Sequence, residues 1–213
     1  MSEPNSISVC VRVRPLNEKE KKTQQTEIIK LVGNAVQTPA VSSGSVTPGI
    51  FAFDRVFGVN SETAELYSAT CAKLTASAVQ GFNGTIFAYG QTSSGKTHTI
   101  RGTEQCPGVL PLAILDMFEQ VKLNVDRKFL IRVCYIEIYN EDIKDLLTDK
   151  AELLKVRRTQ DENFEVVGLT EHVVVSPDEA KAVCYLQRAE TSGYLRMALT
   201  LCCRYGASTL WCQ

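Results

Sequence analysis

A glycine-rich segment at Gly90–Thr97, GQTSSGKT, constrains this chain more than any other part of its sequence. It fits the pattern G-x-x-x-x-G-K-[ST], in which two glycines allow successive backbone N–H groups to point at one anion. The apolar run Thr85–Tyr89 before it is typical of a strand covered on both faces, and a helix is expected to begin at about Lys96. A strand, a glycine-rich turn and a helix in this order predict a phosphate-binding loop in an α/β fold.

Two side chains at the end of this segment indicate which phosphate compound it binds. Lys96 would bring a mobile cation to the β- and γ-phosphates, and the Thr97 hydroxyl is the predicted Mg²⁺ ligand. The helix that begins there would add the positive end of its dipole. The predicted site therefore takes a nucleoside triphosphate with Mg²⁺ and consists of Gly90, Gln91, Thr92, Ser93, Ser94, Gly95, Lys96 and Thr97.

Length and composition fit an ordinary globular domain. The chain has 213 residues, of which 44% are apolar and 22% charged, and a disordered chain would be poorer in apolar side chains. Its formal net charge of −1 gives no global field for nucleic acid or an anionic membrane, so a polyanionic partner would need a local basic patch. The first ten residues lack the features of a secretory signal, and no uncharged apolar run is long enough to span a bilayer.

The eight cysteines are expected to be reduced thiols, because no secretory signal precedes them. Zinc is the alternative, but the chain has no CxxC pair and only two histidines, His98 and His172. Buried thiols acting as small apolar groups are therefore the favoured interpretation.

The rest of the chain alternates between strand and helix signals, with a charged loop at 17–27 and no boundary or repeat, which predicts one α/β unit. Strands are expected at Ser6–Val13, Phe51–Phe57 and Phe129–Tyr139, and a hairpin at Phe164–Val167 and His172–Val175 around Gly168. Helices are expected at 61–80 with Gly81 as the stop, at Pro111–Val121 after a break over Gly102–Gly108, and from a Ser176 cap to about Glu190.

Several segments together resemble one protein family. Residues 81–99, GFNGTIFAYGQTSSGKTHT, are similar to the phosphate loop of kinesin motor domains. The similarity extends in order over residues 6 to about 191, through VRVRP at 11–15, FAFDRVF at 51–57, PGVLPLAI at 107–114 and YIEIYNEDIKDLL at 135–147. Within the family the spacing looks nearest to centromere-associated (CENP-E-type) mitotic kinesins. One departure is Leu112, where kinesins commonly have Arg.

The resemblance implies a fold, a ligand and a place in the cell. The fold would be an α/β P-loop NTPase of kinesin type, with a mixed central sheet and helices on both faces, incomplete at the C-terminal end. ATP with Mg²⁺ would bind, and Arg12, Arg14 and Pro15 would lie on the adenine side. His98 would lie near the adenine, or would be a surface histidine of the first helical turn. Microtubules are the implied partner, and the cytoplasm and the microtubule or spindle cytoskeleton the implied location.

The resemblance also implies a tubulin-binding region at Glu137–Leu147 and the hairpin after it. Lys150, Lys155, Arg157 and Arg158 stand there against only Asp149 and Glu152 nearby, and a positive loop would suit the acidic tubulin surface. The same charges are equally well explained as solvated surface residues.

The resemblance stops after Thr191, so residues 1–191 correspond to the N-terminal part of a kinesin motor domain. Residues 192–213 contain neither the Ser-Ser-Arg-Ser-His run of switch I nor the Asp-Leu-Ala-Gly-Ser-Glu run of switch II. They are expected to be an unrelated tail without a helix or strand period and outside the motor fold. The strand Thr85–Tyr89 would then have two unpaired edges, which predicts an unstable product.

Two functions follow from this pattern. The first is an ATP-dependent microtubule motor in truncated form, without the catalytic residues that the switches supply. The second is a non-motile fragment that binds nucleotide or tubulin without hydrolysis. A different P-loop enzyme, such as a nucleotide kinase, would explain the phosphate loop but not the other kinesin-like segments.

Overall fold

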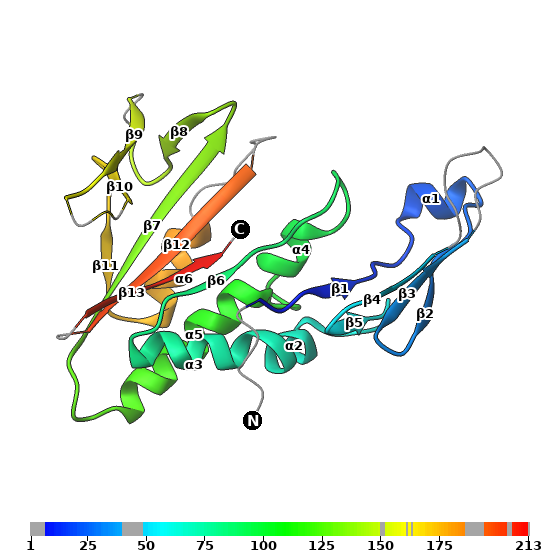
Figure 1. Ribbon diagram of the computed structural model, residues 1–213, viewed down its shortest axis with the longest axis horizontal. Coiled ribbons are helices and arrows are strands. Elements are labelled where there is room, and N and C mark those ends of the chain that lie inside the picture. Colours follow the sequence, from blue (N-terminus) through cyan, green and yellow to red (C-terminus); the bar gives the residue numbers. More distant parts are fainter. Residues whose placement is uncertain are drawn as a thin grey trace. The chain divides into compact units, whose positions relative to one another are not determined.

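The computed structural model describes residues 7–39, 49–149, 152–160, 162 and 164–185, and the backbone of residues 194–203 and 206–212. The chain divides into two compact units, Met1–Leu66 and Tyr67–Gln213, where the sequence predicted a single one (Figure 1). The first unit forms its own small sheets through hydrogen bonds among its own strands, which the strand and helix signals alone do not reveal.

The first unit contains two sheets. β1 (Cys10–Arg12) pairs in parallel with β5 (Arg55–Phe57), and β2 (Lys30–Val32), β3 (Ala35–Thr38) and β4 (Gly49–Ala52) form an antiparallel sheet. The strand predicted over Phe51–Phe57 is therefore two strands. Asp54 separates them, because its side chain accepts a hydrogen bond from the Val9 amide at 2.7 Å and its own amide donates to Val9 at 3.1 Å.

A short helix, α1 (Glu18–Lys22), replaces part of the charged loop predicted at 17–27. Asn17 accepts a hydrogen bond from the Glu20 amide at 2.9 Å, and Glu20 accepts one from the Asn17 amide at 2.8 Å. This reciprocal capping box satisfies two amides at the start of the helix, which favours helix over loop. The first unit ends with α2 (Thr63–Leu66).

The helix predicted at 61–80 is present, with one irregularity. The second unit begins with a π-helical turn, η1 (Tyr67–Cys71), and continues as α3 (Ala72–Gln80). The helix ends at Gly81, as predicted, with φ at 108°, a value that favours glycine. In the π-helical turn the buried Tyr67 hydroxyl donates to Asp116 Oδ2 at 2.6 Å, and its oxygen lies 3.0 Å from Thr75 Oγ1, within hydrogen-bond distance.

A mixed sheet organises the second unit, with the strand order β10-β9-β8-β7-β12-β13-β6 and with β11 paired to β7. Its long strand, β7, covers Phe129–Tyr139 as predicted. The other strands are β6 (Gly84–Ile86), β8 (Asp142–Asp145), β9 (Leu153–Arg158), β10 (Phe164–Val167), β11 (His172–Val174), β12 (Tyr194–Cys203) and β13 (Gly206–Cys212).

The predicted hairpin around Gly168 is wrong, although both of its strands exist. β10 pairs with β9 rather than with β11, and β11 pairs with β7. A cross-strand interaction favours this pairing, because Glu165 on β10 lies opposite Arg157 on β9 and accepts a hydrogen bond from its Nε at 3.0 Å.

The tail contains two strands, Tyr194–Cys203 and Gly206–Cys212, although its sequence shows no clear strand period. β12 runs antiparallel to β7 from Tyr194 opposite Ile138 to Cys203 opposite Phe129, and β13 runs parallel to β6 (Figure 1). β6 therefore has a partner on one edge, where the sequence predicted two unpaired edges. Strand edges need hydrogen-bond partners whatever side chains the partner carries, which is why a sequence without a clear strand period can fill these positions.

Helices α5 (Val109–Leu123) and α6 (Pro177–Tyr185) supply much of the core of the second unit. α5 is the helix predicted after the glycine break, and α6 begins at the predicted cap, where Ser176 Oγ accepts from the Glu179 amide at 3.1 Å. The predicted end of α6 at Glu190 lies outside the described residues. Side chains buried in this core include Ala78, Val79, Val109, Leu110, Ala113, Ile114, Met117, Phe118, Ile131, Val133, Cys134, Tyr135, Ile136, Val174, Ala180 and Cys184.

Candidate functional site

The glycine-rich loop lies in the second unit, between β6 and the short helix α4 (Lys96–Ile100). The strand before it is shorter than the predicted Thr85–Tyr89, because pairing ends at Ile86. Phe87 and Tyr89 are 64% and 95% exposed, so this part of the run does not lie in a covered sheet. The predicted order of strand, loop and helix is nevertheless present.

The backbone of the loop adopts conformations that suit its glycines. Gly95, which caps α4, has φ at 98°, in the left-handed region that favours glycine. A Cβ at Gly90 would lie 2.5 Å from Ser94 Oγ, so a side chain there would displace the Ser94 hydroxyl. Ser93 also has a positive φ, 64°, although it is not glycine. Such residues cost about 1–3 kcal/mol and cluster at ligand-binding loops.

Lys96 is folded back over the loop. Its ammonium Nζ donates to the carbonyl oxygens of Gly90 at 2.7 Å and Gln91 at 2.8 Å. These oxygens carry only partial negative charge, so a phosphate group would be a stronger partner for the same cation. The loop is also internally bonded, since the Ser94 amide donates to the Gln91 carbonyl at 3.2 Å.

The polar side chains needed for a Mg²⁺-nucleotide are at the same place. Gln91, Thr92, Ser93, Thr97 and His98 are exposed, and Thr97 directly follows Lys96 at the start of α4. A threonine hydroxyl and a lysine ammonium next to a curled glycine-rich backbone are chemically suited to a metal-bound triphosphate. The residues present therefore fit the predicted ligand.

Arg12, Arg14 and Pro15, the predicted adenine-side residues, lie in the first unit. Arg12 Nη1 donates to Thr63 Oγ1 at 3.0 Å and its Nη2 to the Ser61 carbonyl at 3.2 Å. Burial lowers the pKa of the Arg12 guanidinium from its ordinary value, which is high enough for the group to stay charged. Arg12 thus contributes to the structure of this unit.

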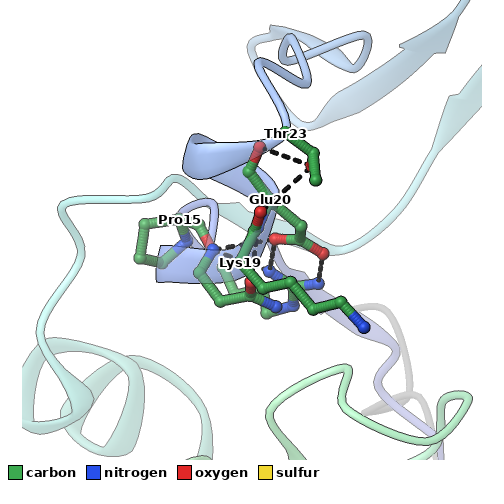
Figure 2. Close-up of polar contacts among 6 residues, drawn as sticks. Pro15, Lys19, Glu20 and Thr23 are labelled. Carbon is green, nitrogen blue, oxygen red and sulfur yellow. Dashed lines mark hydrogen bonds and ion pairs between the residues drawn. The ribbon is translucent and has the colours of Figure 1, made fainter.

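Arg14 is held by Glu20, a residue outside the predicted site. Figure 2 shows the Glu20 carboxylate with its hydrogen bonds. Arg14 Nη1 and Nη2 donate to the two oxygens of Glu20 at 2.7 and 2.6 Å, and Arg14 Nη1 also donates to the Pro15 carbonyl at 2.9 Å. The Asn17-x-x-Glu20 spacing of a capping box was the available signal for Glu20.

The basic residues predicted to meet tubulin have more acidic neighbours than the sequence suggested. On β9, Arg157 pairs with Glu165, and Arg158 Nη2 lies 3.2 Å from Glu162 Oε1. Asp149 and Glu152 are thus not the only acidic residues nearby, because β10 brings Glu165 across the ladder. Lys150 lies outside the described residues.

Cysteine side chains within the described range are reduced thiols, namely Cys10, Cys71, Cys106, Cys134 and Cys184. The same part of the chain holds no cluster of three histidine, cysteine, aspartate or glutamate residues able to bind a metal ion. It also contains no helix long and apolar enough to cross a membrane.

The strand, the glycine-rich loop with its lysine and threonine, and the helix after it define a phosphate loop of the P-loop NTPase class. Residues 12–195 match the family model described as the kinesin motor domain. The chain therefore belongs to the kinesin motor domain family. Kinesins as a family bind nucleotide with Mg²⁺, hydrolyse ATP and associate with microtubules and the cytoskeleton.

Several curated kinesins are similar to this chain. It is 46% identical over 183 residues to human centromere-associated protein E, and the aligned region covers 84% of this chain and 7% of that protein. It is 42% identical over 173 residues to kinesin-like protein KIN-7O of Arabidopsis thaliana, with 81% and 13% covered. Kinesin-related protein 4 of Dictyostelium discoideum is 40% identical over 184 residues, with 83% and 9% covered. The chain thus spans a small part of the length of these relatives.

Proposed function

We propose that this chain binds Mg²⁺-ATP at Gly90–Thr97 and binds microtubules as part of a kinesin-type motor head. The observation that carries the proposal is the position of Lys96, whose ammonium is held over the loop by two carbonyl oxygens. A phosphate group can replace these neutral acceptors with charged ones, so the bound state gains charge-assisted hydrogen bonds. Thr97 is the proposed Mg²⁺ ligand.

The adenine base of ATP would contact other residues, as the resemblance to kinesins implies. Arg12, Arg14 and Pro15 would serve the adenine side, and His98 would lie near the adenine. For Arg14, the bidentate pair with Glu20 fixes the orientation of the guanidinium, and a guanidinium is a group that stacks on aromatic rings.

Nucleotide binding is tested by removing the lysine. Lys96→Ala should weaken Mg²⁺-ATP binding about ten- to a hundredfold, because charge-assisted hydrogen bonds contribute about 1.5–3 kcal/mol. Isothermal titration calorimetry on the full chain gives the affinity. The matched control is Lys73→Ala, which removes an exposed lysine on α3 and should leave the affinity unchanged. Equal affinities for wild type and Lys96→Ala would contradict the proposed site.

Hydrolysis is the point on which the two candidate functions differ. The alternative is a non-motile fragment that binds nucleotide or tubulin without turnover, because residues 192–213 carry a different sequence where the resemblance places switch I. ATP hydrolysis by the full chain, measured with and without microtubules, separates them. Stimulation by microtubules supports the motor, whereas nucleotide binding and microtubule co-sedimentation without turnover support the fragment.

The domain assignment and the location are also proposals. Residues 1–191 would be the motor-related part, and residues 192–213 a segment of unrelated sequence. The proposed location is the cytoplasm, on microtubules of the cytoskeleton or spindle, and imaging of a fluorescent fusion beside labelled tubulin tests it.

A further inference from the structure

Arg101 and Tyr185 join the end of the phosphate-loop helix to the last residue of α6. The Tyr185 hydroxyl donates to the backbone carbonyl oxygen of Arg101 at 3.0 Å. The Arg101 guanidinium carbon lies 5.5 Å from the centroid of the Tyr185 ring, which is within the range of a cation–π interaction. Two contacts of different chemistry therefore connect residues that are 84 positions apart in the sequence.

Arg101 is itself bonded to the phosphate loop. Its amide donates to the Thr97 carbonyl oxygen at 2.8 Å, so it closes the turn of α4 that begins at the proposed Mg²⁺ ligand. Hydrogen bonds thus run from Thr97 through Arg101 to the hydroxyl of Tyr185. One turn of helix therefore connects the proposed Mg²⁺ ligand to the Tyr185 hydroxyl.

The segment after Arg101 holds its carbonyl in place. The Gly108 amide donates to the same Arg101 oxygen at 3.1 Å, and Gly102 and Pro107 form an antiparallel bridge. This hairpin is tightly closed, since a Cβ on Gly102 would lie 2.2 Å from the Cys106 carbonyl oxygen. Burial raises the pKa of Tyr185, so its hydroxyl stays protonated and remains a donor at neutral pH.

We propose that Tyr185 is a positioning residue that couples nucleotide occupancy at Gly90–Thr97 to the last turn of α6. This inference rests on the proposed nucleotide binding. Phosphate draws Lys96 away from its two carbonyl partners and orders the start of α4, and the bonds through Arg101 extend that order to Tyr185. By linkage, α6 favours nucleotide binding by the same factor with which nucleotide orders α6.

The test is hydrogen exchange of the full chain with and without Mg²⁺-AMPPNP, a non-hydrolysable ATP analogue. In wild type the nucleotide should slow exchange both at Gly90–Ile100 and at Pro177–Tyr185. Tyr185→Phe keeps the ring and removes the hydroxyl. It should retain the protection at the loop, lose it at α6, and weaken binding about three- to tenfold, the effect expected for one hydrogen bond.

Lys181→Gln is the matched control, because it alters α6 through an ion pair with Asp178 that stays within that helix. It should keep the wild-type response. Arg101→Gln is a second variant that keeps the carbonyl acceptor and removes the cation over the ring, and part of the α6 response should be lost. Circular dichroism melts verify that each variant is folded.

Three results would overturn the inference. One is a Tyr185→Phe variant that keeps both the α6 response and the wild-type affinity. Another is an equal loss of the α6 response in Tyr185→Phe and Lys181→Gln, because that would show general loosening of α6. The third is wild-type protection at the loop with none at α6. A wild-type chain that does not bind the analogue at all overturns the proposed function, and this inference with it.

Discussion

At the scale of single residues, Glu20 performs two structural tasks with one carboxylate. It accepts hydrogen bonds from both Nη atoms of Arg14, at 2.7 and 2.6 Å, and from the Asn17 amide at 2.8 Å. These donors favour the ionised carboxylate, and the bonds from Arg14 have the largest effect, so the pKa of Glu20 falls to about 2. The start of α1 and the orientation of Arg14 therefore depend on the same negative charge.

This charge makes the stability of the first unit depend on pH. A carboxyl group with a lowered folded-state pKa stabilises the protein above its unfolded pKa, about 4.3, and loses that contribution as the pH falls toward 2. Glu20→Gln should therefore lower the urea midpoint at pH 7 and have progressively less effect between about pH 4.5 and pH 2. Unfolding followed by circular dichroism measures this.

Glu18→Gln is the control for that series. Glu18 is 80% exposed and pairs only with Lys21 among the interactions described for it, so its removal should leave the midpoint nearly unchanged. A wild type and a Glu20→Gln variant that lose stability in parallel over the acid range would show that Glu20 is not the titrating group.

At the scale of elements, the hairpin from Arg101 to Gly108 separates α4 from α5. Gly102 has φ at 69°, and a Cβ there would also lie 2.2 Å from the Gly108 amide nitrogen. Gly108 is equally confined, with its would-be Cβ 2.3 Å from the Ile100 carbonyl oxygen. The glycines thus allow the chain to turn tightly between the end of α4 at Ile100 and the start of α5 at Val109.

Replacing Gly102 should therefore cost more than replacing a glycine with the same kind of backbone but free space. Gly81 has a positive φ, 108°, and no atom within 4 Å of its would-be Cβ, so Gly81→Ala should cost about 1–2 kcal/mol of unfolding free energy. Gly102→Ala should cost about 1–3 kcal/mol more, because of overlap with backbone atoms. Urea unfolding of both variants measures the difference, and equal costs would show that the hairpin opens to admit a side chain.

At the scale of the whole molecule, the sheet of the second unit depends on residues far apart in the chain. β12 lies between β7 and β13, and β13 connects this pair to β6, the strand that leads into the phosphate loop. A central strand is protected from solvent exchange on both edges, whereas an unstructured tail is not. The register of β12 against β7 therefore has a measurable consequence.

Hydrogen exchange of the unliganded chain tests that register. Amides of Tyr194–Cys203 should exchange about as slowly as those of Phe129–Tyr139, because the two strands share a ladder. The amides of Val125 and Asp126, between α5 and β7, provide an internal fast-exchange reference. Fast exchange over the whole of Tyr194–Cys203 would contradict the pairing and support the sequence-based expectation of a tail outside the fold.

Local patterns were sufficient wherever neighbours in sequence are also neighbours in space. The phosphate loop, the stop at Gly81, the strand Phe129–Tyr139 and the cap at Ser176 were all predicted, because each depends on residues within one turn or one strand. The family was likewise evident from the ordered segments around the loop. The Asn17-x-x-Glu20 capping box is a local signal of the same kind, and it indicates the helix α1 in the segment that was predicted as a charged loop.

Tertiary structure decided everything that depends on partners distant in the sequence. Three features have no local signature in the sequence. They are the choice of β9 over β11 as the partner of β10, the pairing of the tail with β7 and β6, and the contact of Tyr185 with Arg101. The sequence by itself determined the glycine-rich loop pattern, because that pattern is contained in eight consecutive residues, Gly90–Thr97, and it determined the family through the ordered segments around the loop. Strand partners and long-range contacts depend on which of several possible pairings buries the most side chains and satisfies the most strand edges. That selection is made only when the whole chain folds.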